Sequence, residues 1–349
     1  MKLLLALDSF KGSLPAREAV DAAAAGLAGG EAVRLPLSDG GEGFTECVVE
    51  TLGGTYRSIL SHDALGRPLL TRYGLVHHGE IAVIETAAAS GLTHLSSSEP
   101  DPVRASSYGT GELIEDAIRQ GVNEIWIGLG GTAVMDAGAG MLRALGPLPA
   151  PVSFRAFYDV NVPLTGPSGA AVVFGPQKGA DEKTILLLEE RFQRQARKWE
   201  EELGKKVDGI PGAGAAGGIG AALAVCLGAE MHAGIGAVLD AVGFRNLLNG
   251  CDLVITGEGR ADRQTLKGKV PYGVLQATRR YAPDVPVVLL AGQVQDRELL
   301  TEAGFDAVVQ VTPERELVDG KGLEPSVARA HIGRTVRQLV QDFPYLRNQ

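Results

Sequence analysis

The chain has 349 residues, of which 45% are hydrophobic and 21% are charged. This composition supports a sizeable core, and the length favours two domains over one. The formal net charge is −9, and no long run of basic residues offsets it. Both facts argue against a nucleic acid or a membrane surface as a partner, so an anionic small molecule would need local lysine and arginine side chains.

The cysteines and the first residues bear on the compartment. Cys47, Cys226 and Cys251 lie far apart and form no CxxC or zinc spacing, which favours reduced core thiols. The apolar run at the start ends at Asp8, too early for a signal peptide, and no segment approaches the length of a membrane span. We expect a cytoplasmic protein without a membrane segment. Whether the protein forms a homo-oligomer is left open by the sequence.

The two ends of the chain carry alternating strand and helix patterns. Strand-like apolar runs at 3–7 and 32–37 flank a helix that opens at Pro15, and another helix is expected over 43–52. The alternation returns after residue 252. The expected elements there are strands at 253–256, 285–290 and 307–311, with helices near 272–281, 297–303 and 326–343.

The middle of the chain has a different pattern. Three short extended runs, 55–60, 69–76 and 81–86, predict an antiparallel meander. The later elements expected here are helices at 109–120, 182–203 and 217–227 and strands at 124–129 and 154–160.

This order of elements predicts the fold class. Two parallel-type strands from the N-terminal end and three from the C-terminal end make one doubly wound parallel sheet, with the middle inserted. The prediction is therefore an α/β protein with two domains. Residues 1–54 and 245–349 form the discontinuous sheet domain, and residues 55–244 form an inserted mixed α/β domain.

Polar, glycine-flanked segments follow the first two strands, where ligands of open α/β sheets bind. Asp8, Ser9 and Lys11 come directly after the first strand. Asp39 opens the segment Asp39-Gly40-Gly41-Glu42-Gly43 after the second. A turn or a helix N-cap would explain one such acid. The second acid and the three glycines exceed that need, so we interpret both segments as parts of a ligand site.

A third polar segment follows the strand at 253–256. It reads Gly257-Glu258-Gly259-Arg260-Ala261-Asp262, with Lys267 and Lys269 shortly after. Glycines that alternate with Glu and Arg at a strand end are poor surface filler. A functional loop is therefore favoured over a solvated one.

Further candidates lie in the middle of the chain. Gly130, Gly131 and Thr132 follow a strand and suit phosphate contact by backbone amides, with Asp136 as a metal or hydroxyl partner. Close helix–strand packing through glycine explains this pattern equally well. Asp159 and Lys178 could supply a further carboxylate and cation.

One GxGxxG match spans Gly212 to Gly217. It follows Ile210-Pro211 rather than a convincing strand, so a glycine-rich helix N-terminus that can bind an anion is favoured over a dinucleotide site. A dinucleotide-dependent oxidoreductase stays an alternative. The motifs GxxxxGK[ST], GxSxG and HExxH are absent, so a kinase would lie outside the superfamilies that carry GxxxxGK[ST] or the protein-kinase motifs.

Several blocks in this order resemble the bacterial class I glycerate kinases, also called glycerate 2-kinases, over nearly the whole chain. The blocks are 8–14, 39–43, 107–114, part of 161–166, 173–180, 211–222 and 255–269 with Pro271. The resemblance implies phosphorylation of D-glycerate to 2-phosphoglycerate with ATP and Mg²⁺. It also implies a flavodoxin-like domain and an inserted α/β domain.

On this resemblance we assign hypothetical roles, since phosphoryl transfer needs mainly positioning and charge stabilisation. Lys11 or Arg260 would hold the glycerate carboxylate, Asp39 or Asp159 would orient or deprotonate the hydroxyl, and Asp136 and Glu258 would position Mg²⁺. Contacts to substrate or phosphates are expected from Asp8, Ser9, Gly130, Gly131, Thr132, Lys178, Gly214, Gly217, Gly257, Gly259 and Lys269.

Two positions depart from the family pattern. Met135 and Val162 stand where the family usually has Asn. The acids are kept while two amides are lost, which puts substrate affinity or specificity in question rather than metal handling. A non-catalytic relative that binds glycerate or a nucleotide is therefore a second alternative.

Overall fold

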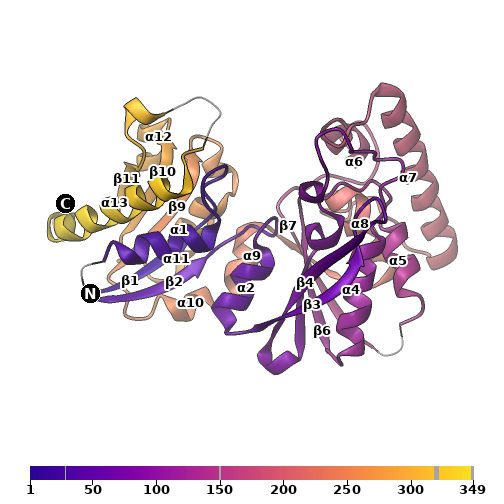
Figure 1. The fold of residues 1–349 in the computed structure, drawn as a ribbon, viewed down its shortest axis with the longest axis horizontal. Helices are drawn as coiled ribbons and strands as arrows, with labels where there is room; N and C mark the ends of the chain where they lie inside the picture. Colours follow the sequence, from indigo (N-terminus) through magenta and orange to yellow (C-terminus); the bar gives the residue numbers. More distant parts are fainter. Residues whose placement is uncertain (28, 149–150, 318–321, 347–349) are drawn as a thin grey trace. The chain divides into compact units, whose positions relative to one another are not determined.

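The computed structural model describes residues 1–27, 29–148, 151–317 and 322–346. Two compact units result (Figure 1). Unit 1 comprises Met1–Asp39 and Ile235–Gln349, and unit 2 comprises Gly40–Gly234. The chain therefore passes from one unit to the other twice, and the two ends of the chain share unit 1.

The division differs from the predicted boundaries mainly in helix α2 (Phe44–Leu52), which the sequence grouped with the N-terminal strands. This helix packs on strands β4 (Pro68–Val76) and β5 (Ile81–Glu85). A Cβ atom on Gly74 of β4 would lie 2.2 Å from Cγ2 of Val49. The missing side chain at Gly74 thus allows α2 to pack closely on β4.

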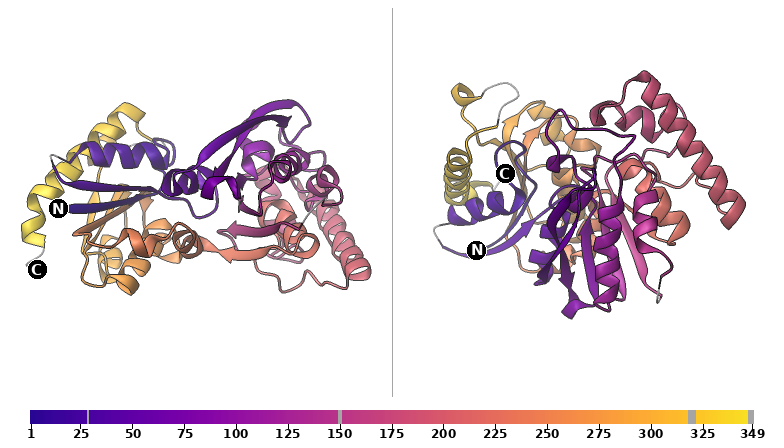
Figure 2. Two further views of the ribbon diagram at one scale, coloured as in Figure 1. Left: turned by 90° about the horizontal axis from the view of Figure 1, so that it is seen from below. Right: turned by 45° about the vertical axis from the view of Figure 1, so that its right-hand side comes forward.

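Unit 1 contains a five-stranded sheet in the order β11-β10-β9-β1-β2, and all neighbouring strands are parallel. The strands are β1 (Lys2–Leu7), β2 (Glu31–Pro36), β9 (Leu253–Ala261), β10 (Val287–Val294) and β11 (Ala307–Gln310). In both views of Figure 2 the indigo N-terminal strands and the orange C-terminal strands share this sheet. The order is that of flavodoxin, with its switch point between β1 and β9.

Helices cover both faces of this sheet. Leu3 and Leu5 of β1 share a core with residues of α1 (Ala16–Ala25) and α13 (Pro325–Leu346). Leu4 and Ala6 point to the opposite face, because side chains alternate along a strand, and they are equally buried. Helix α11 (Val270–Tyr281) packs against β1, β9 and β10 there. The shorter helices of unit 1 are α9 (Gly234–Ala241), α10 (Phe244–Leu247) and α12 (Arg297–Glu302).

Unit 2 contains a six-stranded mixed sheet in the order β3-β4-β5-β6-β7-β8. The predicted meander is confirmed, because β3–β4 and β4–β5 are antiparallel pairs. The remaining pairs are parallel. The strands not yet given are β3 (Thr55–His62), β6 (Glu124–Leu129), β7 (Ser153–Tyr158) and β8 (Glu230–Ala233). Strand β8 was not predicted from the sequence, because its four residues carry no apolar run.

The longer helices of unit 2 match the predicted ones within a few residues. They are α4 (Tyr108–Arg119), α7 (Glu182–Leu203) and α8 (Ala215–Cys226), and shorter helices are α3 (Ala87–Ser90), α5 (Ala139–Leu145) and α6 (Ala170–Phe174). Helix α7 buries Leu188, Phe192 and Trp199 and exposes most of its charged residues. Among the described residues, no helix combines the length and the apolar character needed to cross a membrane.

Candidate active site

Three carboxyl groups gather at the carboxyl edge of the unit 1 sheet. Asp8 follows β1, Glu258 lies on β9, and Asp39 follows β2. Leu7 pairs with Gly257 in the parallel register, and the amide of Asp8 donates to the carbonyl of Gly257 at 2.9 Å. Asp8 and Glu258 are therefore neighbours on adjacent strands at the switch point, where open α/β sheets bind ligands.

The charges at this edge act on Asp8. Burial, together with the nearby Asp39 and Glu258, raises the pKa of Asp8 to about 7, although the Ser9 amide and Lys11 oppose the rise. The Ser9 amide lies 2.6 Å from Oδ1 of Asp8. Because like charges and burial both disfavour ionised carboxylates, this edge favours a bound cation or a proton.

Glu258 is held by two side chains. It is only 5% exposed. Its Oε1 accepts a hydrogen bond from the Thr265 hydroxyl at 2.6 Å, and its Oε2 accepts one from Nζ of Lys269 at 3.0 Å. Burial raises the pKa of Glu258, and these two partners counteract the rise. Lys269, predicted to contact phosphate, thus neutralises Glu258 within unit 1.

Two hydroxyl groups near these acids are buried without a partner among the described residues. They are Oγ of Ser38, next to Asp39, and Oγ1 of Thr256, two residues before Glu258 on β9. Ser38 is 2% exposed and Thr256 is fully buried. Buried hydroxyls are normally satisfied by protein, water or ligand. Both are hydrogen-bonding groups that a ligand at this edge can use.

Gly257 and Gly259 let neighbouring backbone come close to β9. A Cβ atom on Gly259 would lie 2.9 Å from the amide nitrogen of Lys11, and one on Gly257 would lie 2.4 Å from the carbonyl oxygen of Leu290. Lys11 is therefore brought beside β9 because residue 259 has no side chain. Contact of either glycine with phosphate stays a prediction.

Arg260 lies toward the surface at the same end of β9. Its side chain is 57% exposed, with Nε 3.5 Å from Asp262 Oδ2 and Nη2 2.8 Å from Gln295 Oε1. Lys11 is exposed as well. Both cations are therefore available to an anion that approaches from solvent.

In unit 2 a buried lysine joins two predicted segments. Lys178 is only 3% exposed. Its Nζ lies 3.1 Å from Oγ1 of Thr132 and 2.9 Å from the carbonyl oxygen of Val134. Burial lowers the pKa of Lys178 to about 7, and Asp136 opposes this. The Gly130–Thr132 loop at the end of β6 is thus tied to the loop after α6.

Asp136 is engaged within the protein. Its Oδ2 accepts hydrogen bonds from the amide and the hydroxyl of Ser107, both at 2.8 Å, and from the Gly140 amide at 3.0 Å. Its Oδ1 accepts one from the Gly138 amide at 3.1 Å. These bonds join α4 to the loop before α5. A metal at Asp136 would have to compete with them.

Glycines in unit 2 allow close packing around this loop. A Cβ atom on Gly217 would lie 1.9 Å from the Val134 carbonyl oxygen, and one on Gly214 would lie 2.4 Å from that of Pro163. A Cβ atom on Gly130 would lie 2.7 Å from Cα of Gly41, and Gly131 has a φ of 65°. The packing explanation accounts for these glycines, and phosphate contact stays a prediction for them.

Asp159 and Val162 follow β7. Asp159 is exposed, and its contact with substrate stays a prediction. The carbonyl of Val162 accepts the Gly214 amide at 2.8 Å. Met135, in contrast, is 1% exposed and lies in the core of unit 2. The Met135 side chain thus fills the core of unit 2.

Glu85 is an acid that was not among the residues predicted from the sequence. This residue ends β5, and its Oε1 accepts the Thr45 amide at 2.7 Å at the start of α2. Burial raises the pKa of Glu85 to about 7. The signal that could have found it is its position, because an acid at the carboxyl end of a buried strand lies at the same kind of sheet edge as Asp8.

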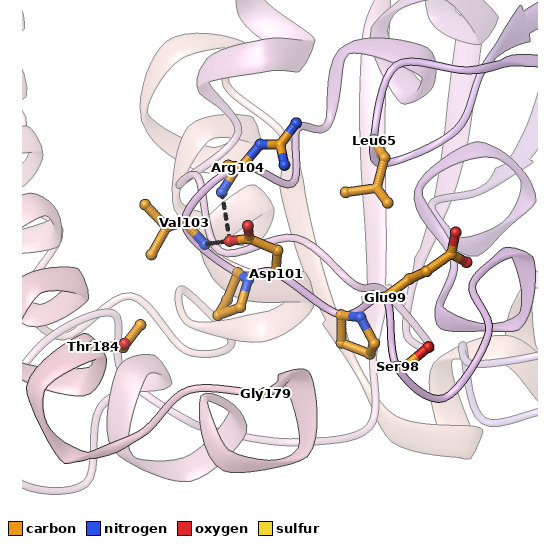
Figure 3. Close-up of a pocket in the computed structure, with 10 residues that line it drawn as sticks. Leu65, Ser98, Glu99, Asp101, Val103, Arg104, Gly179 and Thr184 are labelled. Carbon is orange, nitrogen blue, oxygen red and sulfur yellow. Dashed lines mark hydrogen bonds between the residues drawn. The ribbon is translucent and has the colours of Figure 1, made fainter.

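A cavity of about 440 Å³ lies elsewhere in unit 2 (Figure 3). Leu65, Glu99, Arg104 and Thr184 are among its lining residues, and Gly179, which follows Lys178, borders it. Figure 3 shows the Asp101 carboxylate bonded to the Val103 and Arg104 amides, both at 3.1 Å. None of the predicted site residues lines this cavity.

The acids of unit 1 suit a Mg²⁺ ion that also contacts substrate phosphates. Across the described parts of the chain, no three His, Cys, Asp or Glu side chains are placed to hold one metal ion. Proteins usually bind Mg²⁺ through one or two carboxylates together with substrate phosphates and water. The adjacent acids Asp8 and Glu258 fit that smaller requirement.

Comparisons with known proteins identify the family of this chain. The model of the glycerate kinase family matches residues 3–149 and 147–341. The chain belongs to the glycerate kinase family. A glycerate kinase of Halalkalibacterium halodurans is 40% identical over 89% of this chain and 90% of that protein. The glycerate 2-kinase of Escherichia coli K12 is 36% identical over 95% and 96%.

A solved structure matches the fold of nearly the whole chain. The crystal structure of a Salmonella typhimurium LT2 protein, provisionally assigned to glycerate kinase 2, matches with a TM-score of 0.84 at 36% identity. The match covers 99% of this chain and 98% of that one. Members of a kinase family transfer a phosphoryl group from a nucleotide, so the acids and cations above belong to a phosphotransferase acting on a small molecule.

Proposed function

We propose that this protein is a glycerate 2-kinase that transfers the γ-phosphoryl group of ATP to the 2-hydroxyl of D-glycerate with Mg²⁺. The observation that carries the proposal is the group of Asp8, Asp39 and Glu258 at the switch point of a glycerate kinase family chain. Adjacent carboxylates with nearby cations and no obvious nucleophile are the inventory that direct phosphoryl transfer requires.

In the proposed reaction the 2-hydroxyl oxygen of glycerate attacks the γ-phosphorus, and the bond from that phosphorus to the β,γ-bridging oxygen breaks. The hydroxyl proton passes to a carboxylate, for which Asp39 and Asp159 are the candidates. Lys11 or Arg260 binds the glycerate carboxylate, since both are exposed cations. Lys178 and the Gly130–Thr132 loop would contribute phosphate contacts.

Glu258 and Asp8 are the residues proposed to hold Mg²⁺. The ion would neutralise charge on the transferring phosphates. Glu258 suits the role because Thr265 and Lys269 fix its orientation. Asp136 is the weaker of the two metal ligands predicted from sequence, because four donors of the protein already use its oxygens.

The test is a coupled assay of ADP release with ATP, Mg²⁺ and D-glycerate, with the product resolved by ³¹P NMR. Turnover that needs D-glycerate and yields 2-phosphoglycerate supports the proposal. A product phosphorylated at the 3-position would overturn the assignment of the hydroxyl. Binding of glycerate or nucleotide without turnover would favour the non-catalytic relative.

The dinucleotide alternative lacks structural support. The Gly212–Gly217 segment follows α7 through turns and includes the first residues of α8, so no strand precedes it as the dinucleotide motif requires. A titration with NADH or NADPH that shows no fluorescence change would remove this alternative. A cytoplasmic location and a homo-oligomer stay predictions.

A further inference from the structure

Glu85 links the sheet of unit 2 to the start of α2. It is the last residue of β5 and lies opposite Gly128 of β6 in the parallel register. Its carboxylate accepts the Thr45 amide at 2.7 Å and is also hydrogen-bonded to the backbone of Gly43. Gly43 is the N-cap of α2 and has a φ of 85°. A side chain from the sheet therefore satisfies amides that the helix itself leaves unpaired.

The segment just before α2 is confined on its other side. A Cβ atom on Gly40 would lie 3.0 Å from the backbone of Phe157 on β7. A Cβ atom on Gly128 would lie 2.8 Å from the Gly40 carbonyl oxygen. Gly40–Gly43 is therefore packed against the ends of β6 and β7 while Glu85 holds the residues that follow.

We propose that Glu85 is a positioning residue, whose carboxylate fixes the glycine-rich segment Gly40–Gly43 that directly follows Asp39 in the chain. The inference rests on the proposed function, because it assigns this segment to the active site. Glu85 acts through the segment and touches neither substrate nor nucleotide in this role. Its bonds to the Gly43 backbone and the Thr45 amide are charge-assisted when the carboxylate is ionised, which makes them stronger than neutral ones.

Electrostatics makes this anchor sensitive to pH. Burial is the largest cause that raises the pKa of Glu85 to about 7, with Glu42 of the segment and Glu46 of α2 adding to it, and the bonds from Thr45 and Gly43 oppose the rise. The neighbouring strand β6 presents Gly128 opposite it. As the pH falls through 7, Glu85 takes up a proton and its bonds weaken to the strength of neutral ones.

The test compares Glu85→Gln with wild type in the full chain. Hydrogen exchange of peptides covering residues 40–52 is measured by mass spectrometry from pH 6 to 8, after correction for the intrinsic exchange rate. In wild type we expect protection at the start of α2 to decrease as the pH falls through 7. In E85Q we expect low protection at every pH, and kcat lower by on the order of 10²-fold with a smaller change in KM.

Glu124→Gln is the matched control. Glu124 is the first residue of β6, so it lies at the end of the strand opposite to the end where Glu85 lies on β5. It accepts the Trp126 indole N–H at 2.8 Å. This variant should keep wild-type kcat and wild-type protection over residues 40–52. If E85Q fails to fold, Glu85→Asp gives the same test. The shorter side chain keeps the negative charge but places the carboxylate farther from the Gly43 and Thr45 amides.

Unchanged protection and unchanged kcat in E85Q would overturn the proposal. Equal loss of protection throughout unit 2 would also overturn it, since that outcome indicates a purely structural role. The exchange measurement needs no turnover, so it stands apart from the proposed function. Local loss of protection in a protein that does not phosphorylate glycerate would support the anchoring by Glu85 and reject the glycerate 2-kinase assignment.

Discussion

Lys178 and Thr132 form a buried hydrogen bond, with 3.1 Å between Nζ and Oγ1. The Val134 carbonyl takes a second bond from the same ammonium group. An ammonium group has three donors, so these two bonds orient the third. A loop at the end of β6 is thereby fixed by a cation whose burial opposes its own charge.

Replacing Lys178 with Met should change how stability depends on pH. The pKa of Lys178 in the folded chain is about 7, below its ordinary value of 10.5. The unfolded state then binds the extra proton between these values, so wild type gains stability as the pH rises through this window. Between pH 7.5 and 9.5 the unfolding free energy of wild type should rise by about 2 kcal/mol more than that of K178M. Urea denaturation at both pH values measures it.

The control for that experiment is Lys183→Met, which removes an exposed lysine of α7. If the unfolding free energies of wild type and K178M stay parallel across the two pH values, the inferred burial of the charge is wrong. Under the proposed function K178M should also lose most of its kinase activity.

Replacing Asp8 with Asn should stabilise the protein in the absence of Mg²⁺ and nucleotide. The pKa of Asp8 is raised from 3.8 to about 7, so ionisation above pH 7 costs folding free energy that Asn does not incur. The melting temperature of D8N should exceed that of wild type at pH 8, and the difference should shrink at pH 5. Asp284→Asn, at an exposed acid of unit 1, should stay near wild type at both pH values. A D8N protein less stable than wild type at pH 8 would contradict the prediction.

Replacing Thr265 with Val should remove one of the two hydrogen bonds that orient the Glu258 carboxylate. The Thr265 hydroxyl is fully buried and donates to Glu258 at 2.6 Å. Loss of a buried hydrogen bond to a charged group should lower the unfolding free energy by about 2 kcal/mol. Activity should fall as well, measured as kcat/KM for D-glycerate. Thr265→Ser keeps the hydroxyl and should retain most of the stability and most of the activity. If T265S and T265V lose the same stability and activity, the hydrogen bond to Glu258 does not have this role.

The strand pattern predicted the sheet of unit 1 because buried parallel strands read as short apolar runs. The position of α2 could not be predicted in this way. The strand pattern carries no information on where a helix packs, and the close approach of Val49 to β4 depends on the missing side chain at Gly74. Strand β8 was missed because its half-exposed residues resemble a loop.

For the candidate site, position along the strands predicted that Asp8, Asp39 and Glu258 lie at one sheet edge. The sequence could not show that Lys269 neutralises Glu258 or that four donors surround Asp136, because these contacts depend on the path of loops. Glu85 was missed because no glycine flanks it. Its partner amides come from a helix 40 residues earlier in the chain.

Replacing Met135 with Asn, the residue that the family resemblance leads us to expect there, should be harmful in this protein. Met135 is 1% exposed within the core of unit 2. A buried amide without a designed partner should lower the unfolding free energy by about 2 kcal/mol. Met135→Leu, which conserves volume, should cost less. A clear rise of kcat/KM for D-glycerate in M135N would instead identify position 135 as a specificity determinant.

Replacing Asp39 or Asp159 with Asn distinguishes the two candidate bases. Loss of a general base should lower kcat by on the order of 10²–10⁴-fold. We expect this for D39N, with the circular dichroism spectrum and melting temperature close to wild type. Near-normal turnover of D39N together with a large loss in D159N would transfer the role to Asp159.

Unit 1 is built from both ends of the chain, and this determines when the protein can fold during synthesis. The backbone amide of Lys2, on β1, bonds to the carboxylate of Asp252, 250 residues later in the chain. Unit 2 is complete once residue 234 has left the ribosome, whereas β1 waits for β9. Until then one edge of a leucine-rich strand stays open to other chains. A ribosome that stalls after residue 234 would therefore release a chain with a finished inserted unit and an aggregation-prone N-terminus.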